Sequence, residues 1–192
     1  MSRFLLTLSL LALAGAAPAA DWPQWRGPNR DSVWNETGIL ETFPPDGLKV
    51  RWRVPVGIGF SSPIVARGRV FLTDSVLARP NASERVQAFD ELTGKLLWSY
   101  TYQVSYPDAA FNEASLRGPI ATPITADGRV YSLGASGIVL CLNALKGSLL
   151  WRKDLQKEYP ASPLQPGSSP LIEGELLIVL VGAKPGASAR NR

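Results

Sequence analysis

A pattern of eleven residues occurs twice in this chain and begins a third time. Its first copy is Ser61–Phe71 and its second is Ala121–Tyr131, with Pro at the third place and Gly at the eighth. A third copy starts at Ser168, so the prolines stand 60 residues apart (63 to 123) and then 47 residues apart (123 to 170). Spacings of this size are typical of chains built from copies of one small unit, each of which buries its apolar face against its neighbours.

A second pattern follows the first two copies and ends in tryptophan. It covers Ala88–Trp98 and Cys141–Trp151, and each copy places a glycine four residues before the tryptophan. Short apolar, β-branched runs lie around these patterns, and Asp127-Gly128 joins two of them as a tight hairpin would, because both turn residues must accept positive φ. Each unit is therefore predicted to hold four short antiparallel strands, and repeats of such units are typical of a β-propeller.

We therefore predict an all-β fold, a β-propeller of four-stranded antiparallel blades of which about two and a half are present. The expected divisions are a signal peptide at 1–20, an irregular N-terminal segment at 21–48 and a partial propeller at 49–192, with blades at about 57–102, 119–154 and 168–182. The expected strands are 60–66, 69–74, 85–90 and 95–102, then 120–126, 129–133, 138–143 and 148–154, then 169–172 and 175–181. Polar segments at 77–84 and 104–118 are predicted to lie outside the strands.

The segment Lys49–Val56 precedes the first unit and predicts a lone fourth strand. Its Trp52 lies 46 residues before Trp98 (52 to 98), in the register of the repeat tryptophans. In a closed ring a leading fourth strand completes the last blade, and closure removes the exposed strand edges. Rings take about four to eight blades. We therefore expect this sequence to be the front portion of a longer protein.

The N-terminus has the pattern of an export signal. Arg3 supplies the positive start, Phe4–Ala14 the apolar run, and Ala17-Pro18-Ala19 a cleavage site of small residues. The apolar run is shorter than the roughly 20 residues of a membrane span, so no span is expected. No cysteine lies near the cleavage site, so no lipid anchor is expected there. The predicted location is the periplasm or the exterior of the cell.

The composition excludes several classes of function. The chain contains no His, which removes Ser-His-Asp and Cys-His pairs and His-based zinc sites. Its formal charge is +4, with no cluster of Lys or Arg, so no nucleic-acid partner is expected. The single cysteine, Cys141, lies in an apolar run and is predicted to be a buried, inert thiol.

The segment 104–118 is the longest connection between the predicted strands. Propeller loops of this kind are where ligands are usually bound, because the strands only position them. A solvated insertion is the alternative for this loop. Asp108 and Glu113 are a candidate catalytic pair, although loop carboxylates are ordinarily solvated. The side chains of interest in this loop are Tyr106, Asp108, Phe111, Asn112, Glu113 and Arg117.

The sequence Ala88-x-Asp90-x-x-Thr93-Gly94-Lys95-x-x-Trp98 resembles the tryptophan-docking repeat of the pyrroloquinoline quinone (PQQ)-type β-propellers. The second copy keeps Gly147 and Trp151 but departs from the repeat at other places. This resemblance implies that Trp98 and Trp151 pack between adjacent blades. The stretch Trp22-Pro23-Gln24-Trp25-Arg26-Gly27-Pro28, together with Arg117-Gly118-Pro119, is similar to a subfamily of secreted bacterial proteins described as PQQ-binding-like or BamB-like.

Two functions of different classes follow from the resemblance. The favoured hypothesis is a non-catalytic, secreted scaffold that binds a protein or carbohydrate ligand at its blade loops, with no catalytic, cofactor or metal residues. The alternative is a fragment of a PQQ-dependent alcohol or sugar dehydrogenase, in which the resemblance implies Ca²⁺, a catalytic Asp and adjacent cysteines. The sequence contains no Cys-Cys pair, and no acidic cluster matches residue by residue. A non-functional gene fragment is a third hypothesis.

Overall fold

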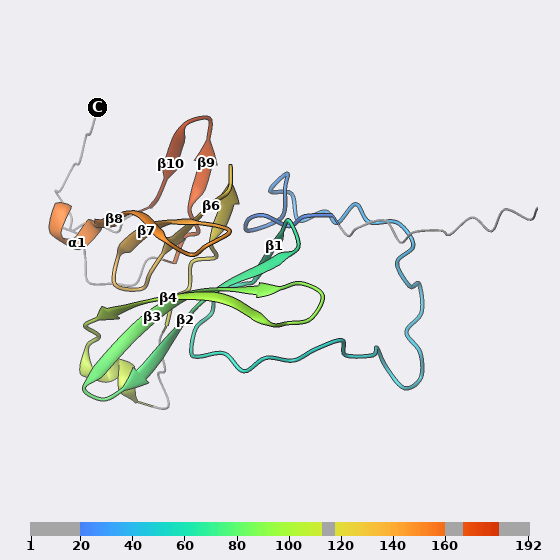
Figure 1. The fold of residues 1–192 in the computed structure, drawn as a ribbon, viewed down its shortest axis with the longest axis horizontal. Coiled ribbons are helices and arrows are strands. Elements are labelled where there is room, and N and C mark those ends of the chain that lie inside the picture. The colour runs from blue at the N-terminus through green and yellow to red at the C-terminus, as the bar shows by residue number, and fades with distance from the viewer. Residues whose placement is uncertain (1–19, 113–117, 160–166, 181–192) are drawn as a thin grey trace, which may run out of the picture.

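The computed structural model describes residues 20–112, 118–159 and 167–180, and these form two four-stranded antiparallel sheets and a hairpin (Figure 1). The first blade is β1 (Ile64–Ala66), β2 (Arg69–Ala78), β3 (Asn81–Asp90) and β4 (Leu96–Val104), and the second blade is β5 (Ile124–Ala126), β6 (Arg129–Leu133), β7 (Ile138–Asn143) and β8 (Leu149–Asp154). The third blade is represented by β9 (Leu171–Glu173) and β10 (Leu176–Ile178). Two short helices, η1 (Asp108–Phe111) and α1 (Leu155–Glu158), follow the first two blades.

The order of strands in each sheet is their order along the chain, and every neighbour is antiparallel. This is the arrangement of propeller blades, so the predicted all-β fold class is confirmed. The hairpin turns form as predicted, because Asp127 and Gly128 have φ of 49° and 73°. Among the described residues, no helix is long and apolar enough to cross a membrane.

We call the first strand of each blade (β1, β5 and β9) its inner strand, and the inner strands of the first two blades are shorter than predicted. The sequence predicts strands at 60–66 and 120–126, whereas β1 and β5 contain three residues each. The residues before β1 bond across to the next blade, since the N–H groups of Phe60 and Ser61 both donate to the Pro119 carbonyl, at 2.8 and 3.1 Å. Pro63 has no N–H to donate to a strand ladder. The inner strands therefore begin only after this inter-blade contact.

The polar segment at 77–84 is not an excursion, and that prediction is wrong. Strands β2 and β3 run on through it as one long hairpin that turns at Arg79-Pro80, with Ala78 opposite Asn81. In β3 alternate residues face inward, and Glu84 is one of them, at 1% exposure. An inward carboxylate breaks the apolar alternation by which a strand is recognised, so the pattern pointed to a loop.

The predicted lone strand at Lys49–Val56 is also wrong, because no described strand lies beside this segment. A strand requires a neighbour for its backbone N–H and C=O groups. The first such pairing in this region comes at Ile58, which exchanges hydrogen bonds of 2.9 and 2.7 Å with Ser75.

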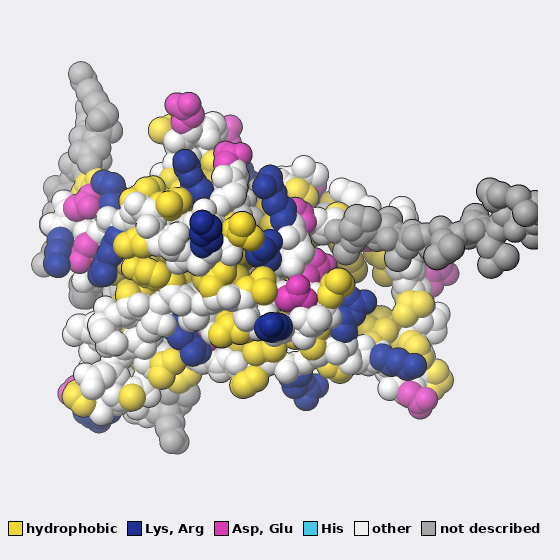
Figure 2. Space-filling view, viewed as in Figure 1, with side chains coloured by type: hydrophobic (Ala, Val, Ile, Leu, Met, Phe, Trp, Pro, Cys, Tyr) yellow, Lys and Arg dark blue, Asp and Glu magenta, His cyan; other side chains and the backbone are white. Residues whose placement is uncertain are grey.

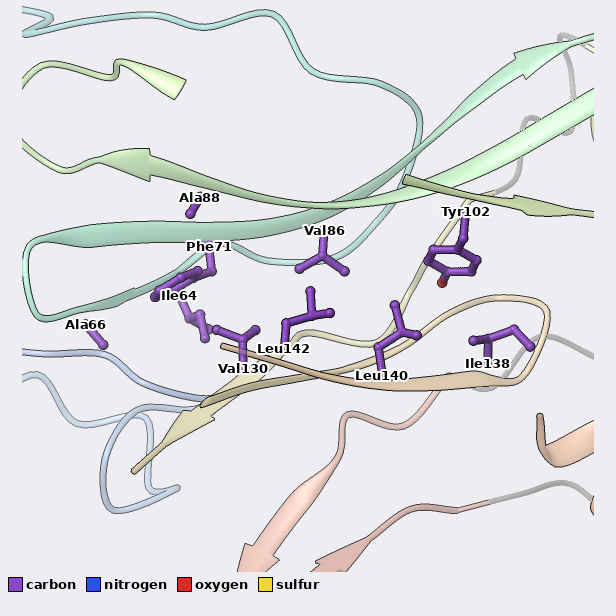
Figure 3. Close-up of a cluster of buried hydrophobic side chains, with 10 residues drawn as sticks. All are labelled: Ile64, Ala66, Phe71, Val86, Ala88, Tyr102, Val130, Ile138, Leu140 and Leu142. Carbon is purple, nitrogen blue, oxygen red and sulfur yellow. The ribbon is translucent and has the colours of Figure 1, made fainter. Parts of the chain in front are cut away.

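The main hydrophobic core lies between the first two blades (Figure 3). Side chains of the two sheets face one another across it, so neither sheet buries this face without the other. Several of its members are at most 1% exposed, and these include Ile64, Phe71 and Val86 of the first blade and Val130, Leu140 and Leu142 of the second. The blades therefore depend on each other for burial of their apolar faces.

A further contact between the first two blades places a tryptophan on a turn glycine. The ring of Trp98 lies on Gly147, where an added Cβ would come within 2.5 Å of the ring atom Cδ2. Its indole N–H donates to the Ala144 carbonyl at 3.1 Å. The docking position predicted for Trp98 is thus confirmed. Trp52 makes the same contact one blade earlier, with Gly94 under its ring and a hydrogen bond of 2.9 Å to the Glu91 carbonyl.

The turns beneath these tryptophans are held by side-chain oxygens. One carboxylate oxygen of Asp90 accepts from the Thr93 N–H at 2.9 Å and from the Thr93 hydroxyl at 2.7 Å. These bonds hold the pKa of Asp90 below its usual value. In the second copy the Asn143 side-chain oxygen accepts from the Lys146 N–H at 2.9 Å, so the amide replaces the carboxylate.

Trp151 differs from Trp98 in its surroundings. It packs against Tyr131 with ring centroids 6.0 Å apart, and 37% of its surface stays exposed. In the described part of the chain no turn glycine lies under its ring. The packing predicted between blades is therefore observed for Trp98 and not for Trp151.

The contact between Trp98 and Gly147 can be measured with a matched pair of glycine variants. Gly147 and Gly128 have nearly the same φ, 70° and 73°, but a Cβ at Gly128 meets nothing within 4 Å. We expect Gly128→Ala to cost about 1 kcal/mol, for left-handed backbone alone. Gly147→Ala should cost about 2 kcal/mol more, because it also displaces the indole. Equal losses in urea unfolding would show that docking does not constrain position 147.

Candidate functional site

An N-terminal segment lies along the inner edges of the blades. We call Asp21–Arg30 the axial strap. Trp22 exchanges two backbone hydrogen bonds with Val65 of β1, at 2.7 and 3.0 Å, on the side away from β2. The next strap residue, Pro23, accepts a bond of 2.9 Å from the N–H of Thr125 in β5. The strap therefore joins the inner strands of two blades through main-chain atoms.

The far end of the strap reaches the third blade. The guanidinium of Arg30 donates to the Ile172 carbonyl in β9 at 2.6 Å and lies 3.5 Å from the Glu173 carboxylate. The near end is fixed by Asp21, whose carboxylate accepts the N–H of Arg67 at 3.0 Å. All three blades represented in the structure thus contact this one segment.

The strap holds its shape by contacts within itself. Gln24 is 8% exposed, and its amide donates to the Pro28 carbonyl at 3.1 Å and accepts from Arg30 at 3.3 Å. Gly27 has φ of 81° and lies against the ring of Trp22, where a Cβ would come within 2.8 Å. Only glycine meets both conditions without strain.

Hydroxyl groups link the starts of the inner strands. The N–H of Ser62 donates to the Thr122 hydroxyl at 3.2 Å, and the N–H of Thr122 donates to the Ser169 hydroxyl at 2.9 Å. Each of these residues directly precedes the proline of its repeat. The residue before a proline is held extended, which fixes the direction of these groups. Each blade therefore supplies the acceptor for the blade before it.

A cavity of about 650 Å³ opens between the strap, the inner strand starts and the third blade. Trp25 and Phe60 offer it apolar surface, since 54% and 67% of them is exposed. Arg26 and Arg30 give the lining its positive charge, and its described residues include no carboxylate. The lining is Gln24, Trp25, Arg26, Arg30, Phe60, Ser62, Ile120, Thr122, Gly167, Ser168, Ser169, Pro170 and Leu171.

A buried carboxylate, that of Glu84, lies between the first two blades, and we call Glu84 with its partners Tyr102, Tyr106 and Ser136 the Glu84 cluster. Glu84 accepts hydrogen bonds from the Tyr102 hydroxyl, from the Tyr106 hydroxyl at 2.7 Å and from the N–H of Ser136 at 3.2 Å. Gly134 leaves the room that Glu84 and Tyr102 occupy, since a Cβ there would collide with both. Burial raises the pKa of both tyrosines well above the ordinary value near 10, and the charge of Glu84 raises it further.

A second buried carboxylate belongs to Asp74, whose side chain is 2% exposed. Arg85 binds it through two nitrogens, at 2.8 and 2.5 Å, and the N–H of Gly57 donates to it at 2.5 Å. The bond to Asp74 raises the pKa of Arg85, so the guanidinium stays charged at neutral pH. The pair fixes the chain at Gly57 against β2, and no sequence pattern singled out either residue.

Some side chains of the loop at 104–118 are buried and others are exposed. Tyr106 belongs to the buried cluster, whereas the side chain of Asp108 is 89% exposed and lies 3.5 Å from Arg79. Phe111 is half-buried and Asn112 is exposed. Glu113 and Arg117 lie outside the described residues, so the proposed pairing of Asp108 with Glu113 stays a prediction.

Cys141 is fully buried in β7, as predicted, and burial raises the pKa of its thiol. Within the ranges that the structure describes, no three His, Cys, Asp or Glu residues are grouped so that they can hold a metal ion.

The repeats place the chain in a known family. The family model described as outer membrane protein assembly factor BamB, which covers PQQ-like repeats, matches residues 44–117 and again residues 111–188. The chain belongs to this family. The two matches cover the first two blades and the described third hairpin, so the family is carried by the repeats themselves.

Individual relatives are longer proteins. The chain is 24% identical over 177 residues to the dehydrogenase subunit of the quinone alcohol dehydrogenase of Gluconobacter oxydans (strain 621H), which covers 87% of this chain and 22% of that protein. The quinohemoprotein alcohol dehydrogenase of Comamonas testosteroni superposes with a TM-score of 0.54 at 18% identity, over 88% of this chain and 24% of that one. BamB of Moraxella catarrhalis gives 0.37 at 13% identity, over 65% and 42%. The chain therefore spans about a fifth to a quarter of the two dehydrogenases.

The buried cluster predicts a specific stability effect. Tyr106→Phe removes a hydrogen bond to the Glu84 carboxylate and should lower the free energy of unfolding by about 2 kcal/mol. Tyr100→Phe is the control, because the hydroxyl of Tyr100 has no partner among the described residues, and it should change stability by less than about 0.5 kcal/mol. Equal effects of the two variants would contradict the role given to the cluster.

The same cluster predicts a dependence on alkaline pH. The pKa of Tyr106 is raised in the folded state above its value in the unfolded chain. Its hydroxyl therefore contributes stability that is present in full below about pH 10 and is lost as pH rises further. The difference in unfolding free energy between the native chain and Tyr106→Phe should therefore shrink between about pH 9 and pH 11. Urea unfolding at several pH values measures it, and a constant difference would show that Tyr106 ionises as easily folded as unfolded.

Proposed function

We propose that this chain is part of an exported, non-catalytic β-propeller scaffold whose partner is a protein. The observation that carries this proposal is the axial strap. A quinone enzyme of this architecture needs a ring that encloses the cofactor and protein groups that orient it and fix its charge. Here the inner edges of the described blades bind the chain's own Trp22, Pro23 and Arg30. The space that a cofactor would need is partly filled by the protein itself.

The chemistry of the axial cavity supports the same proposal. The alternative function implies PQQ with Ca²⁺, an ion that takes 6–8 oxygen ligands and prefers carboxylates among them. The described lining of this cavity supplies hydroxyls and the two guanidinium groups of Arg26 and Arg30. A cavity lined by hydroxyls and guanidinium groups, beside which the Glu173 carboxylate is already paired with Arg30, does not fit a calcium ion.

The family description supports a role in protein binding. It names an assembly factor for outer membrane proteins. We propose the periplasm or the exterior of the cell as the location of this chain. The predicted signal peptide at 1–20, on which export depends, lies outside the described residues except for Ala20. A carbohydrate ligand at the blade loops stays a prediction.

One observation favours the alternative, that the chain is a fragment of a PQQ-dependent dehydrogenase. The sequence match to the Gluconobacter oxydans subunit runs through 87% of this chain. The groups that would bind a quinone and its calcium would then be supplied by parts of the parent protein that this sequence does not contain.

Titration of the full-length gene product with PQQ in millimolar Ca²⁺ distinguishes the two functions, because any quinone ligands that lie outside this sequence are then present. We expect no saturable quenching of tryptophan fluorescence at micromolar PQQ, and no dye reduction when an alcohol is added. Trp25→Ala is the matched control, because Trp25 lines the axial cavity and is exposed. Saturable quenching of the native chain that is lost in Trp25→Ala would identify a quinone site at the axis and refute the scaffold.

A further inference from the structure

The three blades present the same position to the axial strap. Val65, Thr125 and Ile172 each lie two residues after the proline of their repeat (63, 123 and 170). Each has a backbone group directed to the strap, and these groups are the N–H and C=O of Val65, the N–H of Thr125 and the C=O of Ile172. The repeat therefore generates a row of equivalent main-chain donors and acceptors along the inner edges.

The strap is recognised mainly through its backbone. Its bonds to β1 and β5 are all between main-chain atoms. The ring of Trp22 packs on the strap's own Gly27, and 54% of Trp25 is exposed. Main-chain pairing at a strand edge gives affinity with little demand on sequence, as when an extended peptide adds a strand to a sheet.

The strap is joined to the first blade by a long connection. Residues 33–56 contain no strand and are exposed at nearly every position, with Trp52 as the main point of contact. This connection extends to one side of the blades, at the right of Figure 1 and Figure 2. The strand ladders of the two blades and the Trp52 contact involve no residue of the strap.

We propose that the inner edges of the blades form a groove for an extended peptide segment of a partner protein, and that the axial strap is its resident, exchangeable occupant. This rests on the proposed scaffold function, because a catalytic ring would need this space for its cofactor. The partner segment pairs its main chain with Val65. Its next residue offers only a carbonyl, so proline is accepted there as at Pro23. An arginine further along the segment donates to the Ile172 carbonyl and pairs with the Glu173 carboxylate, as Arg30 does.

A labelled peptide of residues 21–32 tests the groove. It is titrated against the native chain, against Trp22→Pro, which removes the N–H that donates to Val65, and against Trp34→Pro, a control in the exposed connection. The resident strap competes at a high effective concentration. We therefore expect Trp22→Pro to bind the peptide at least about tenfold more tightly than the native chain or Trp34→Pro. A peptide that itself carries Trp22→Pro should bind none of them.

Peptide anisotropy that is the same for the three chains would overturn the proposal. Hydrogen exchange on the native chain is a second measurement, which tests the proposal if the Trp22→Pro variant does not fold. The N–H groups of Val65 and Thr125 donate to the strap, whereas that of Asn143 donates to Ser148 within the second blade. The first two should exchange at least about tenfold faster than the third. Exchange of all three at one rate would show that the strap leaves only when the blades unfold. Neither measurement involves a quinone, so their failure would leave the PQQ titration to decide the scaffold function.

Discussion

The structure depends on satisfying the backbone groups at the inner edges of its blades. Strands of three residues, such as β1 and β5, leave main-chain donors and acceptors directed away from their own sheets. Unpaired groups of this kind are costly when buried. The axial strap forms hydrogen bonds with the backbone groups of Val65 and Thr125. The hydroxyls of Thr122 and Ser169 accept hydrogen bonds from the N–H groups at the strand starts. Blade spacing, the axial cavity and the proposed groove all follow from how these groups are paired.

Besides the hydrogen bonds at the strand starts, two kinds of side-chain contact hold the first blade to the second, and they differ in what they tolerate. The apolar core and the docked Trp98 rely on shape, and conservative changes of volume are tolerated best there. The Glu84 cluster relies on complete hydrogen bonding, because a buried carboxylate that loses a donor is left uncompensated. The Glu84 cluster fixes the relative position of the blades and of the loop that carries Tyr106.

Much of the fold could be predicted from the sequence, because turn glycines and docking tryptophans recur at fixed spacing. Gly94, Gly147 and Trp98 are examples, since their roles are local and repeated. The site could not be predicted in the same way. Glu84 breaks the apolar alternation of its strand, and its donors come from distant positions. The strap has no strand period, and it is held by edges that exist only once the blades have folded. Lys49–Val56 has a strand pattern but no described neighbour.

The docked tryptophan gives each blade two different sides. Trp98 on β4 reaches forward to the glycine turn of the next blade, while the Gly94 turn of its own blade receives Trp52 from behind. The interface is therefore head-to-tail, with unlike surfaces that meet in one direction only. A unit copied within the gene arrives with both surfaces already matched to its neighbours. Lengthening such an array requires no new interface, and its polarity is set by the first copy.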